Sequence, residues 1–388
     1  MSDDRKALMR AGAAAVKKFS KTAVSEPASK ALEFTSLWAS TGSLALDRLF
    51  SGRNPGGIPM GPRFGRVIHI PGEWSTGKSL LLDHAFKSVI VDLKGLAVCT
   101  ETEGTRDPHF ANAIGLPLDM LLIQRPKSFE EGFDMFIEWH NAVRKEDAEI
   151  PILWGWDSLD SSESEKSSDQ GLTESGGWHF GGGRAEVLGA GLRKLVVLTS
   201  RFPTTLIMLN QTRDNVGVMF GPKKRTPGGN PPHFYASLEV MLSPSSRPDK
   251  GLVRDAAREH GLTDAALKRL GLKYVIDNTR VRGRYIQAKV SKTKMAMTFD
   301  TTAEFYLDFQ RGLHAWEGLA ERLMFEGLLL TGSDGASDFE MAGKKFPNKT
   351  EWLKWLSLEL NKGEYDSVGL GTTNEDNVNA PVLEAEAS

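Results

Sequence analysis

One eight-residue stretch, Gly-Glu-Trp-Ser-Thr-Gly-Lys-Ser at residues 72–79, constrains this chain more than any other. It matches the phosphate-loop pattern G-x-x-x-x-G-K-[ST] at every fixed position. The glycines let backbone N–H groups approach phosphate oxygens, and the helix that follows presents the positive end of its dipole. A surface turn is the alternative, but an apolar run at residues 67–70 and helical apolar spacing at residues 79–91 favour a phosphate loop. The expected nucleotide-binding residues are Gly72, Glu73, Trp74, Ser75, Thr76, Gly77, Lys78 and Ser79.

A second motif supplies the metal-binding side of such a site. Lys78 is expected to reach the β- and γ-phosphates, and Ser79 to offer its hydroxyl to a bridging Mg²⁺. The apolar run at residues 150–156 ends at Asp157, the Walker B arrangement, in which the carboxylate holds the metal through water. Many strands end in an aspartate that caps the next helix, so Asp157 supports the prediction only together with the phosphate loop.

Composition sets the broad class of protein. At 388 residues the chain has room for one large domain and one or two small ones, and 40% hydrophobic with 25% charged residues is typical of a soluble globular protein. The formal net charge of -2 is unevenly distributed and does not exclude a nucleic-acid partner. Cys99 is the only cysteine, which indicates a reducing compartment. Because the sequence shows no membrane-spanning run and no signal-peptide pattern, we expect a cytoplasmic protein without a membrane partner.

Apolar runs and helical patterns alternate along the middle of the chain. Strands are expected at residues 67–70, 95–100, 150–156 and 204–209, and helices at residues 79–91, 129–144 and 185–198. This alternation predicts an α/β fold with a mainly parallel central sheet and helices on both faces. Ligands bind such sheets at the C-terminal ends of the strands, where Glu101 and Glu103 are expected to lie.

Two long glycine-bounded loops, at residues 161–184 and 214–230, interrupt the alternation and are too long for plain connectors. In the first, Trp178 and Phe180 either stack on bases or pack on the core. In the second, three apolar residues precede the basic run 223–225. Cations neutralise phosphates while exposed apolar side chains wedge between bases or stack on them. A solvated charge run is the alternative for the basic residues, but it does not explain the apolar ones.

The second loop and its flanks carry a resemblance to a known family. Leu-Asn-Gln-Thr-Arg-Asp-Asn-Val-Gly-Val-Met-Phe-Gly at residues 209–221, followed by Thr-Pro-Gly-Gly-Asn and Phe-Tyr-Ala-Ser, closely resembles the second DNA-binding loop of bacterial RecA recombinases. Further stretches resemble the family in the same order. They are Ser-Thr-Gly-Ser-Leu-Ala-Leu-Asp from residue 40, the phosphate loop, residues 103–111, Asp157-Ser158, and Lys-Thr-Lys-Met-Ala from residue 292.

The resemblance implies a RecA-type ATPase core and roles for single residues in it. Glu103 is similar to the glutamate that orients the attacking water, a general-base role. Phe110 falls where the family places an aromatic ring against adenine. Gln211 is similar to the glutamine that senses the γ-phosphate and passes its state to the loop behind it. The implied cofactors are ATP and Mg²⁺.

The resemblance also implies contacts with other subunits and with DNA. Lys292 and Lys294 are similar to the pair that reaches a neighbouring subunit's ATP site, in the manner of an arginine finger in trans. Phe234 corresponds to a residue of the subunit interface. The first loop has no close family counterpart, so its detailed contacts stay open. The DNA-binding residues expected from the two loops are Trp178, Phe180, Arg184, Arg213, Met219, Phe220, Lys223, Lys224, Arg225, Gly228, Gly229 and Asn230.

Four regions are expected along the chain. They are an N-terminal helix and linker for subunit contact (1–39), the RecA-like ATPase and DNA-binding core (40–312), a small helical C-terminal lobe (313–363) and an acidic disordered tail (364–388). The N-terminal helix packs either on a neighbouring subunit or on its own domain. An insertion at residues 243–285 carries Arg280, Arg282 and Arg284, for which phosphate binding and interface packing both stay open. Such divergence at both ends is typical of a bacteriophage-encoded or otherwise distant relative, which would work in the host cytoplasm.

The expected function is that of an ATP-dependent recombinase. Such a protein forms a helical filament on single-stranded DNA and catalyses homologous pairing and strand exchange in recombination and repair, as a DNA-dependent ATPase. Its partners are single- and double-stranded DNA and further copies of itself, with loader or single-strand-binding proteins as additional candidates. A hexameric helicase of the same fold and a non-catalytic protein that coats single-stranded DNA are the alternatives.

Overall fold

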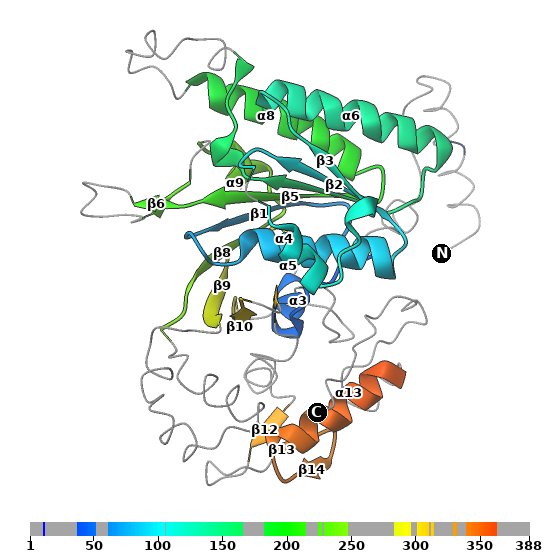
Figure 1. Cartoon of the computed structure of the whole chain (residues 1–388), viewed down its shortest axis with the longest axis vertical. Helices are drawn as coiled ribbons and strands as arrows, with labels where there is room; N and C mark the ends of the chain where they lie inside the picture. Colours follow the sequence, from blue (N-terminus) through cyan, green and yellow to red (C-terminus); the bar gives the residue numbers. More distant parts are fainter. Residues whose placement is uncertain are drawn as a thin grey trace.

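A central sheet organises the structure (Figure 1). The computed structural model describes residue 11 and residues 37–51, 61–104, 106–165, 182–214, 224–226, 229–246, 283–295, 301–309, 312–313, 329–331 and 339–362. The strands of the sheet are β1 (Val67–Gly72), β2 (Leu96–Glu101), β3 (Leu121–Gln124), β4 (Ile152–Asp157), β5 (Thr204–Gln211), β8 (Leu238–Pro244), β9 (Gly283–Thr293), β10 (Thr302–Asp308) and β11 (Gly312–Leu313). Within the described residues they lie in the order β11-β10-β9-β8-β1-β5-β4-β2-β3.

The pairing of these strands confirms the predicted α/β class with a mainly parallel sheet. The strands from β8 to β3 in this order are parallel to one another. The remaining pairs, β8 with β9, β9 with β10 and β10 with β11, are antiparallel. The register places Gly72 beside Gln211 and Glu101 beside Asp157. The C-terminal ends of β1, β5, β2 and β4 therefore meet at one edge of the sheet, where α/β proteins bind ligands.

Helices cover both faces of the sheet, as the sequence predicts. They are α3 (Leu44–Ser51), α4 (Lys78–Lys87), α5 (Pro108–Ala113), α6 (Phe129–Glu146), α8 (Gly182–Thr199) and α9 (Pro231–Tyr235), and α4 continues into a π-helical turn, Ser88–Asp92. Figure 1 shows α6 and α8 over one face and α3, α4 and α5 on the other side. Each layer buries its own apolar cluster against the sheet.

Strand β4 links these two clusters and delivers an acidic residue to the edge. Trp154 lies on the α6 face, where its ring stacks on Phe136 with centroids 3.8 Å apart. Gly155 lies on the α4 face, where an added Cβ would come within 2.5 Å of Phe86 Cζ. Because side chains alternate along a strand, Asp157 shares the α4 face with Gly155. The strand therefore points this carboxylate toward the helix that starts at the phosphate loop.

The C-terminal lobe differs from the helical lobe that the sequence predicts. Its described residues form an antiparallel sheet of β12 (Leu329–Thr331), β13 (Phe339–Met341) and β14 (Lys344–Phe346), followed by helix α13 (Lys349–Lys362). Trp352 of α13 is buried and its ring stacks on Phe339. Strands of three residues are too short to show an alternating pattern. The described part of the lobe therefore contains a helix, as the sequence predicts, and three short strands that the sequence does not predict.

Several predicted elements lie outside the described residues. These are the N-terminal helix apart from residue 11, most of the first glycine-rich loop, most of the insertion and the acidic tail. The division of the chain into four regions stays a prediction. In the part of the chain that the structure describes, no helix combines the length and the hydropathy needed to cross a bilayer.

Candidate nucleotide-binding and DNA-binding site

The phosphate loop joins β1 to α4 at the edge of the sheet. Its backbone turns through left-handed conformations at Ser75 (φ 56°) and Gly77 (φ 75°), and Gly77 directly precedes the first residue of α4. A Cβ on Gly72 would lie 2.9 Å from the Leu242 carbonyl oxygen. Both glycines are therefore required by the fold of the loop, in agreement with the motif. The N-terminus of α4 faces the resulting concavity, which suits an anion.

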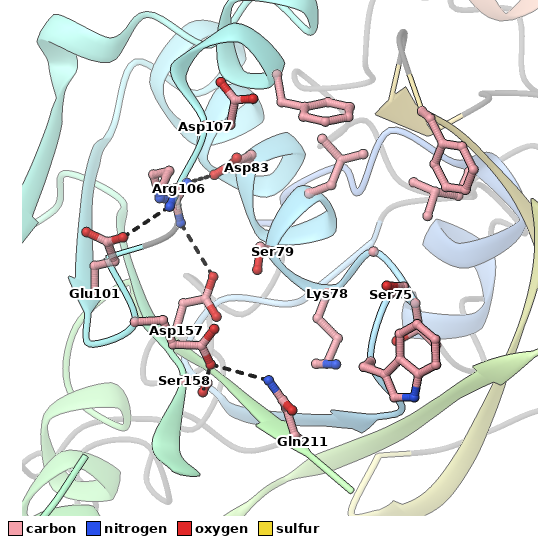
Figure 2. Close-up of a pocket in the computed structure, with 18 residues that line it drawn as sticks. Ser75, Lys78, Ser79, Asp83, Glu101, Arg106, Asp107, Asp157, Ser158 and Gln211 are labelled. Carbon is pink, nitrogen blue, oxygen red and sulfur yellow. Dashed lines mark hydrogen bonds and ion pairs between the residues drawn. The ribbon is translucent and has the colours of Figure 1, made fainter. Parts of the chain in front are cut away.

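A pocket of about 450 Å³ opens beside this loop (Figure 2). The pocket brings together most of the residues that the sequence assigns to the nucleotide, whereas Gly72 and Glu73 contribute through the backbone behind it. The lining residues are Trp74, Ser75, Thr76, Gly77, Lys78, Ser79, Leu80, Asp83, Glu101, Glu103, Arg106, Asp107, Phe110, Asp157, Ser158, Gln211, Leu307 and Phe309.

Lys78 is held inside the phosphate loop. Its Nζ donates hydrogen bonds to the carbonyl oxygens of Gly72 at 3.2 Å and Glu73 at 2.7 Å. Burial lowers the pKa of Lys78 below its ordinary value, and the nearby carboxylates of Asp157 and Asp160 offset only part of this lowering. The ammonium group is thus a buried cation next to the anion-binding concavity, as a phosphate contact requires.

Ser79 and Asp157 form the candidate metal side of the pocket. The Ser79 hydroxyl donates to the Asp157 carboxylate; burial raises the pKa of Asp157, whereas this bond and the charge of Arg106 lower it. Among the described residues, no group of three or more His, Cys, Asp or Glu side chains could enclose a metal by itself. One hydroxyl and one carboxylate fit Mg²⁺, which keeps several waters and takes further ligands from phosphate oxygens. The donor set therefore fits the predicted magnesium.

Glu103 lies in a second polar group at the adjacent strand ends. Its Oε1 accepts hydrogen bonds from Ser158 Oγ and Ser161 Oγ at 2.5 and 3.1 Å, and from Gln211 Nε2 at 3.5 Å. The Gln211 backbone N–H also donates to Asp160 Oδ1 at 3.3 Å. Glu103 and Gln211, which are far apart in sequence, thus meet beside the phosphate loop. The peptide bond between Asp157 and Ser158 is cis.

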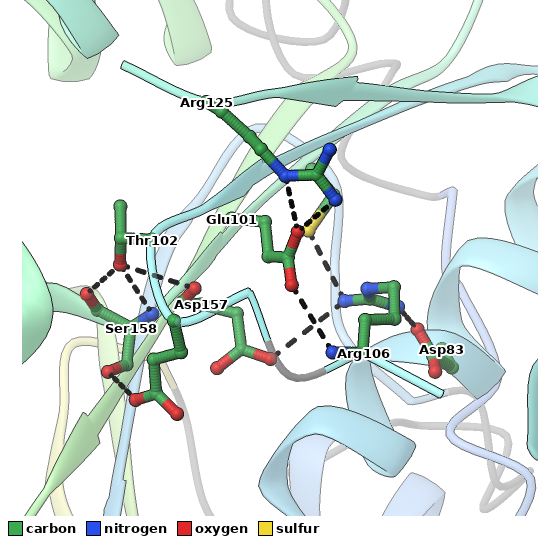
Figure 3. A network of polar contacts seen from close by, with 9 residues as sticks. Asp83, Glu101, Thr102, Arg106, Arg125, Asp157 and Ser158 are labelled. Carbon is green, nitrogen blue, oxygen red and sulfur yellow. Dashed lines mark hydrogen bonds and ion pairs between the residues drawn. The ribbon is translucent and has the colours of Figure 1, made fainter. Parts of the chain in front are cut away.

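An ionic network that the sequence analysis did not identify lies behind these residues (Figure 3). Arg106 pairs with Asp83 of α4 and lies 3.8 Å from Asp157 Oδ2. Glu101 accepts two hydrogen bonds from Arg125, at 2.9 and 2.7 Å, and one from the Arg106 backbone N–H at 3.2 Å. The only available sequence signal is Asp83 itself, a charge among the apolar positions of a predicted helix. Glu101 is engaged as a structural partner, which leaves Glu103 as the better candidate for a base.

Three apolar side chains line the pocket together with the polar residues. They are Phe110 of α5, Leu307 and Phe309, and the N-cap of α5 is Asp107, whose side chain accepts from the His109 N–H. Trp74 in the phosphate loop is 74% exposed. The predicted place of Phe110 is consistent with a flat apolar wall for adenine.

Lys292 and Lys294 do not line the pocket of their own chain. Both ammonium groups lie on α9, where Lys292 Nζ donates to the carbonyl oxygens of His233 and Phe234 and Lys294 Nζ lies 3.4 Å from the latter. Phe234 is 65% exposed. The three predicted interface residues therefore form one surface, which we call the lysine edge.

The lysine edge is anchored to the core by Glu239 of β8. Its carboxylate accepts from Ser291 Oγ at 2.6 Å and bonds His69 Nδ1 at 2.8 Å and His233 Nδ1 at 2.9 Å. Burial by itself would raise the pKa of Glu239, but the bonds from His69 and Ser291 outweigh it and lower the pKa to about 2. His69 is in β1, three residues before Gly72, so one ionised carboxylate ties the lysine edge to the strand that carries the phosphate loop.

The candidate DNA side is described only in part. Arg213 and Asp214 form β6 (Arg213–Asp214), which pairs antiparallel with β7 (Lys224–Arg225) directly beyond the end of β5. Figure 1 shows this ribbon projecting from the edge of the sheet. Gly229, with φ 72°, and Asn230 are exposed where the chain returns to α9. Of the other predicted DNA contacts, Trp178, Phe180, Met219, Phe220, Lys223 and Gly228 lie outside the described residues.

Arg184, one of the predicted DNA contacts, makes side-chain contacts within its own domain. Its Nη2 donates to the Leu159 carbonyl oxygen at 2.6 Å, and its guanidinium lies over the Phe129 ring. The side chain is therefore engaged within the domain, between α8, α6 and the segment after β4.

Fold and pocket together define the class: an α/β domain with a phosphate loop at the carboxyl edge of a mainly parallel sheet, of the RecA type. Residues 6–250 match the family model of the RecA N-terminal domain. The chain belongs to the RecA family. It is 34% identical over 203 residues to proteins named "Protein RecA" from Staphylococcus aureus strains JH9 and Newman. The matched stretch covers 52% of this chain and 53% of each relative, so the chain spans about half the length of the curated relatives it matches.

Proposed function

We propose that this protein is an ATP-dependent recombinase that assembles as a helical filament on single-stranded DNA and exchanges homologous strands. One observation carries the proposal most strongly. The strand ends of the sheet bring Lys78, Ser79, Asp157, Glu103 and Gln211 into one pocket, and the last of these residues leads directly into the β6–β7 ribbon. A nucleotide pocket and a candidate DNA element therefore share one strand.

The pocket residues divide the work of ATP hydrolysis among them. The phosphate loop and Lys78 bind the triphosphate, while Ser79 and Asp157 hold Mg²⁺, whose charge offsets that of the phosphates. Glu103 accepts the proton of the attacking water as general base. Phe110 and its apolar neighbours hold the adenine end. Gln211, which contacts Glu103, reports the presence of the γ-phosphate to the ribbon that follows β5.

Assembly brings the lysine pair of one copy to the nucleotide pocket of the next. The lysine edge lies away from its own pocket, so Lys292 and Lys294 complete the pocket of a neighbouring copy and stabilise charge on the transferred phosphoryl group. Sequence is read by base pairing between DNA strands, and the protein needs only phosphate and stacking contacts. Single- and double-stranded DNA, further copies of the chain, and loader or single-strand-binding proteins are its partners. The cytoplasm, of a bacterial host if the protein is phage-encoded, is its place of action.

We expect ATP hydrolysis to be slow without DNA and strongly stimulated by single-stranded oligonucleotides, because Glu103 and the lysine pair meet only at a filament interface. Steady-state phosphate release, measured with and without a long oligonucleotide, tests this. Lys78→Ala is the control for contaminating ATPases. Equal rates of hydrolysis with and without DNA would contradict the proposed coupling between the nucleotide pocket and the β6–β7 ribbon.

A further inference from the structure

Arg106 is a buried cation inside the nucleotide pocket that the proposed mechanism does not use (Figures 2 and 3). Its side chain is 11% exposed and pairs with Asp83, whose side chain is 6% exposed. Its Nη2 lies 3.8 Å from Asp157 Oδ2 and 3.2 Å from Cys99 Sγ. Side chains of three elements, β2, α4 and β4, therefore meet at the guanidinium that the segment before α5 carries.

The carboxylates of Asp83 and Asp157 interact differently with the Arg106 guanidinium. Asp83 makes the direct ion pair, whereas the longer separation from Asp157 leaves that carboxylate free to accept from Ser79. Burial lowers the pKa of Arg106 and the charge of Asp157 raises it, so the guanidinium stays protonated. Asp157 thus faces a hydroxyl on one side and a fixed positive charge on the other.

We propose that Arg106 is a positioning residue whose fixed charge beside Asp157 sets the Mg²⁺ concentration that nucleotide binding requires. The inference rests on the proposed function, since it needs Asp157 to be the magnesium-binding carboxylate. Asp83 acts as the counterion of Arg106 and weakens the positive potential that Arg106 produces at Asp157.

The sign of the effect follows from Coulomb's law. A fixed cation beside Asp157 disfavours the arrival of a second, divalent cation, and a unit charge a few ångströms from a divalent ion contributes more than RT even in a water-like dielectric. Removal of the Arg106 charge therefore lowers the Mg²⁺ requirement. Removal of the Asp83 charge leaves Arg106 paired with Asp157 alone, and therefore raises it.

The experiment titrates Mg²⁺ into the full chain mixed with a fluorescent ATP analogue and reads binding, not turnover. We expect Arg106→Gln to lower the half-saturating Mg²⁺ concentration by roughly fivefold or more, Arg106→Lys to leave it near the wild-type value, and Asp83→Asn to raise it. The charge-conserving lysine variant separates charge from packing. A purely structural role for Arg106 would weaken binding at all Mg²⁺ concentrations without this ordered shift.

Arg106→Gln leaves Asp83 buried and unpaired, and the variant could therefore fail to fold. A second variant tests the inference in that case. The double variant Asp83→Leu with Arg106→Leu replaces the ion pair by apolar side chains, a change that is often neutral for stability. It also removes the nearest cation from Asp157 and should lower the Mg²⁺ requirement, by less than Arg106→Gln. An unchanged or raised Mg²⁺ requirement in folded Arg106→Gln or in the double variant overturns the inference alone. A shift in Arg106→Lys equal to that in Arg106→Gln overturns it as well. A wild-type protein that shows no Mg²⁺-dependent binding overturns the proposed function with it.

Discussion

Glu103→Gln should lower the rate of ATP hydrolysis by about 10²–10⁴-fold while ATP binding stays close to that of the wild type. Glutamine keeps the shape of the side chain and an oxygen that accepts from Ser158 and Ser161, but it cannot take up a proton. Single-turnover hydrolysis and nucleotide affinity, measured on the same preparation, separate the two effects. The variant should also form long-lived ATP-bound assemblies on DNA.

Lys78→Ala is the matched control, because it removes a phosphate contact and not the base. It should weaken ATP binding and abolish turnover together. Normal turnover in Glu103→Gln would show that the base is elsewhere, and Glu101 would be the next candidate. The two hydrogen bonds between Arg125 and Glu101 argue against that alternative.

Replacement of Lys292 and Lys294 by alanine should leave nucleotide binding intact and lower turnover by on the order of 10³-fold, comparable to the loss of an arginine finger. The reason is that neither lysine lines the pocket of its own chain. A mixture of this double variant with Lys78→Ala should regain activity. In the mixed filament, some interfaces join an intact phosphate loop to an intact lysine pair.

Two controls make the mixing experiment decisive. Each variant alone must stay inactive at the total protein concentration of the mixture, and co-assembly must be confirmed by differential labelling. Co-assembled filaments without recovered activity at any mixing ratio would count against action in trans.

The nucleotide pocket was open to prediction from the sequence because its main signals are local. The phosphate loop fixes Lys78 and Ser79 by spacing, and the apolar run that ends at Asp157 places that carboxylate at the same edge of the sheet. The resemblance supplied Glu103 and Gln211. Their contact in the structure depends on the strand order, which places the ends of β2 and β5 on either side of β4 and which no local pattern encodes.

The ionic groups around the pocket could not be predicted for the same reason. Arg106 of a loop pairs with Asp83 of a helix, and His69 pairs with Glu239 on the neighbouring strand. Neither pair has a fixed spacing in the sequence. These ion pairs matter because they are buried, and which side chains become buried depends on how the whole sheet assembles. The strands of the C-terminal lobe escaped prediction because three residues are too few to establish a period of two.

Electron microscopy of the purified chain with Mg²⁺, ATP and long single-stranded DNA separates a filament from a ring and from an unassembled ATPase. We expect continuous helical filaments that require both nucleotide and DNA and that Lys78→Ala does not form. Closed rings on the DNA, or particles that hydrolyse ATP without assembling, would contradict this expectation.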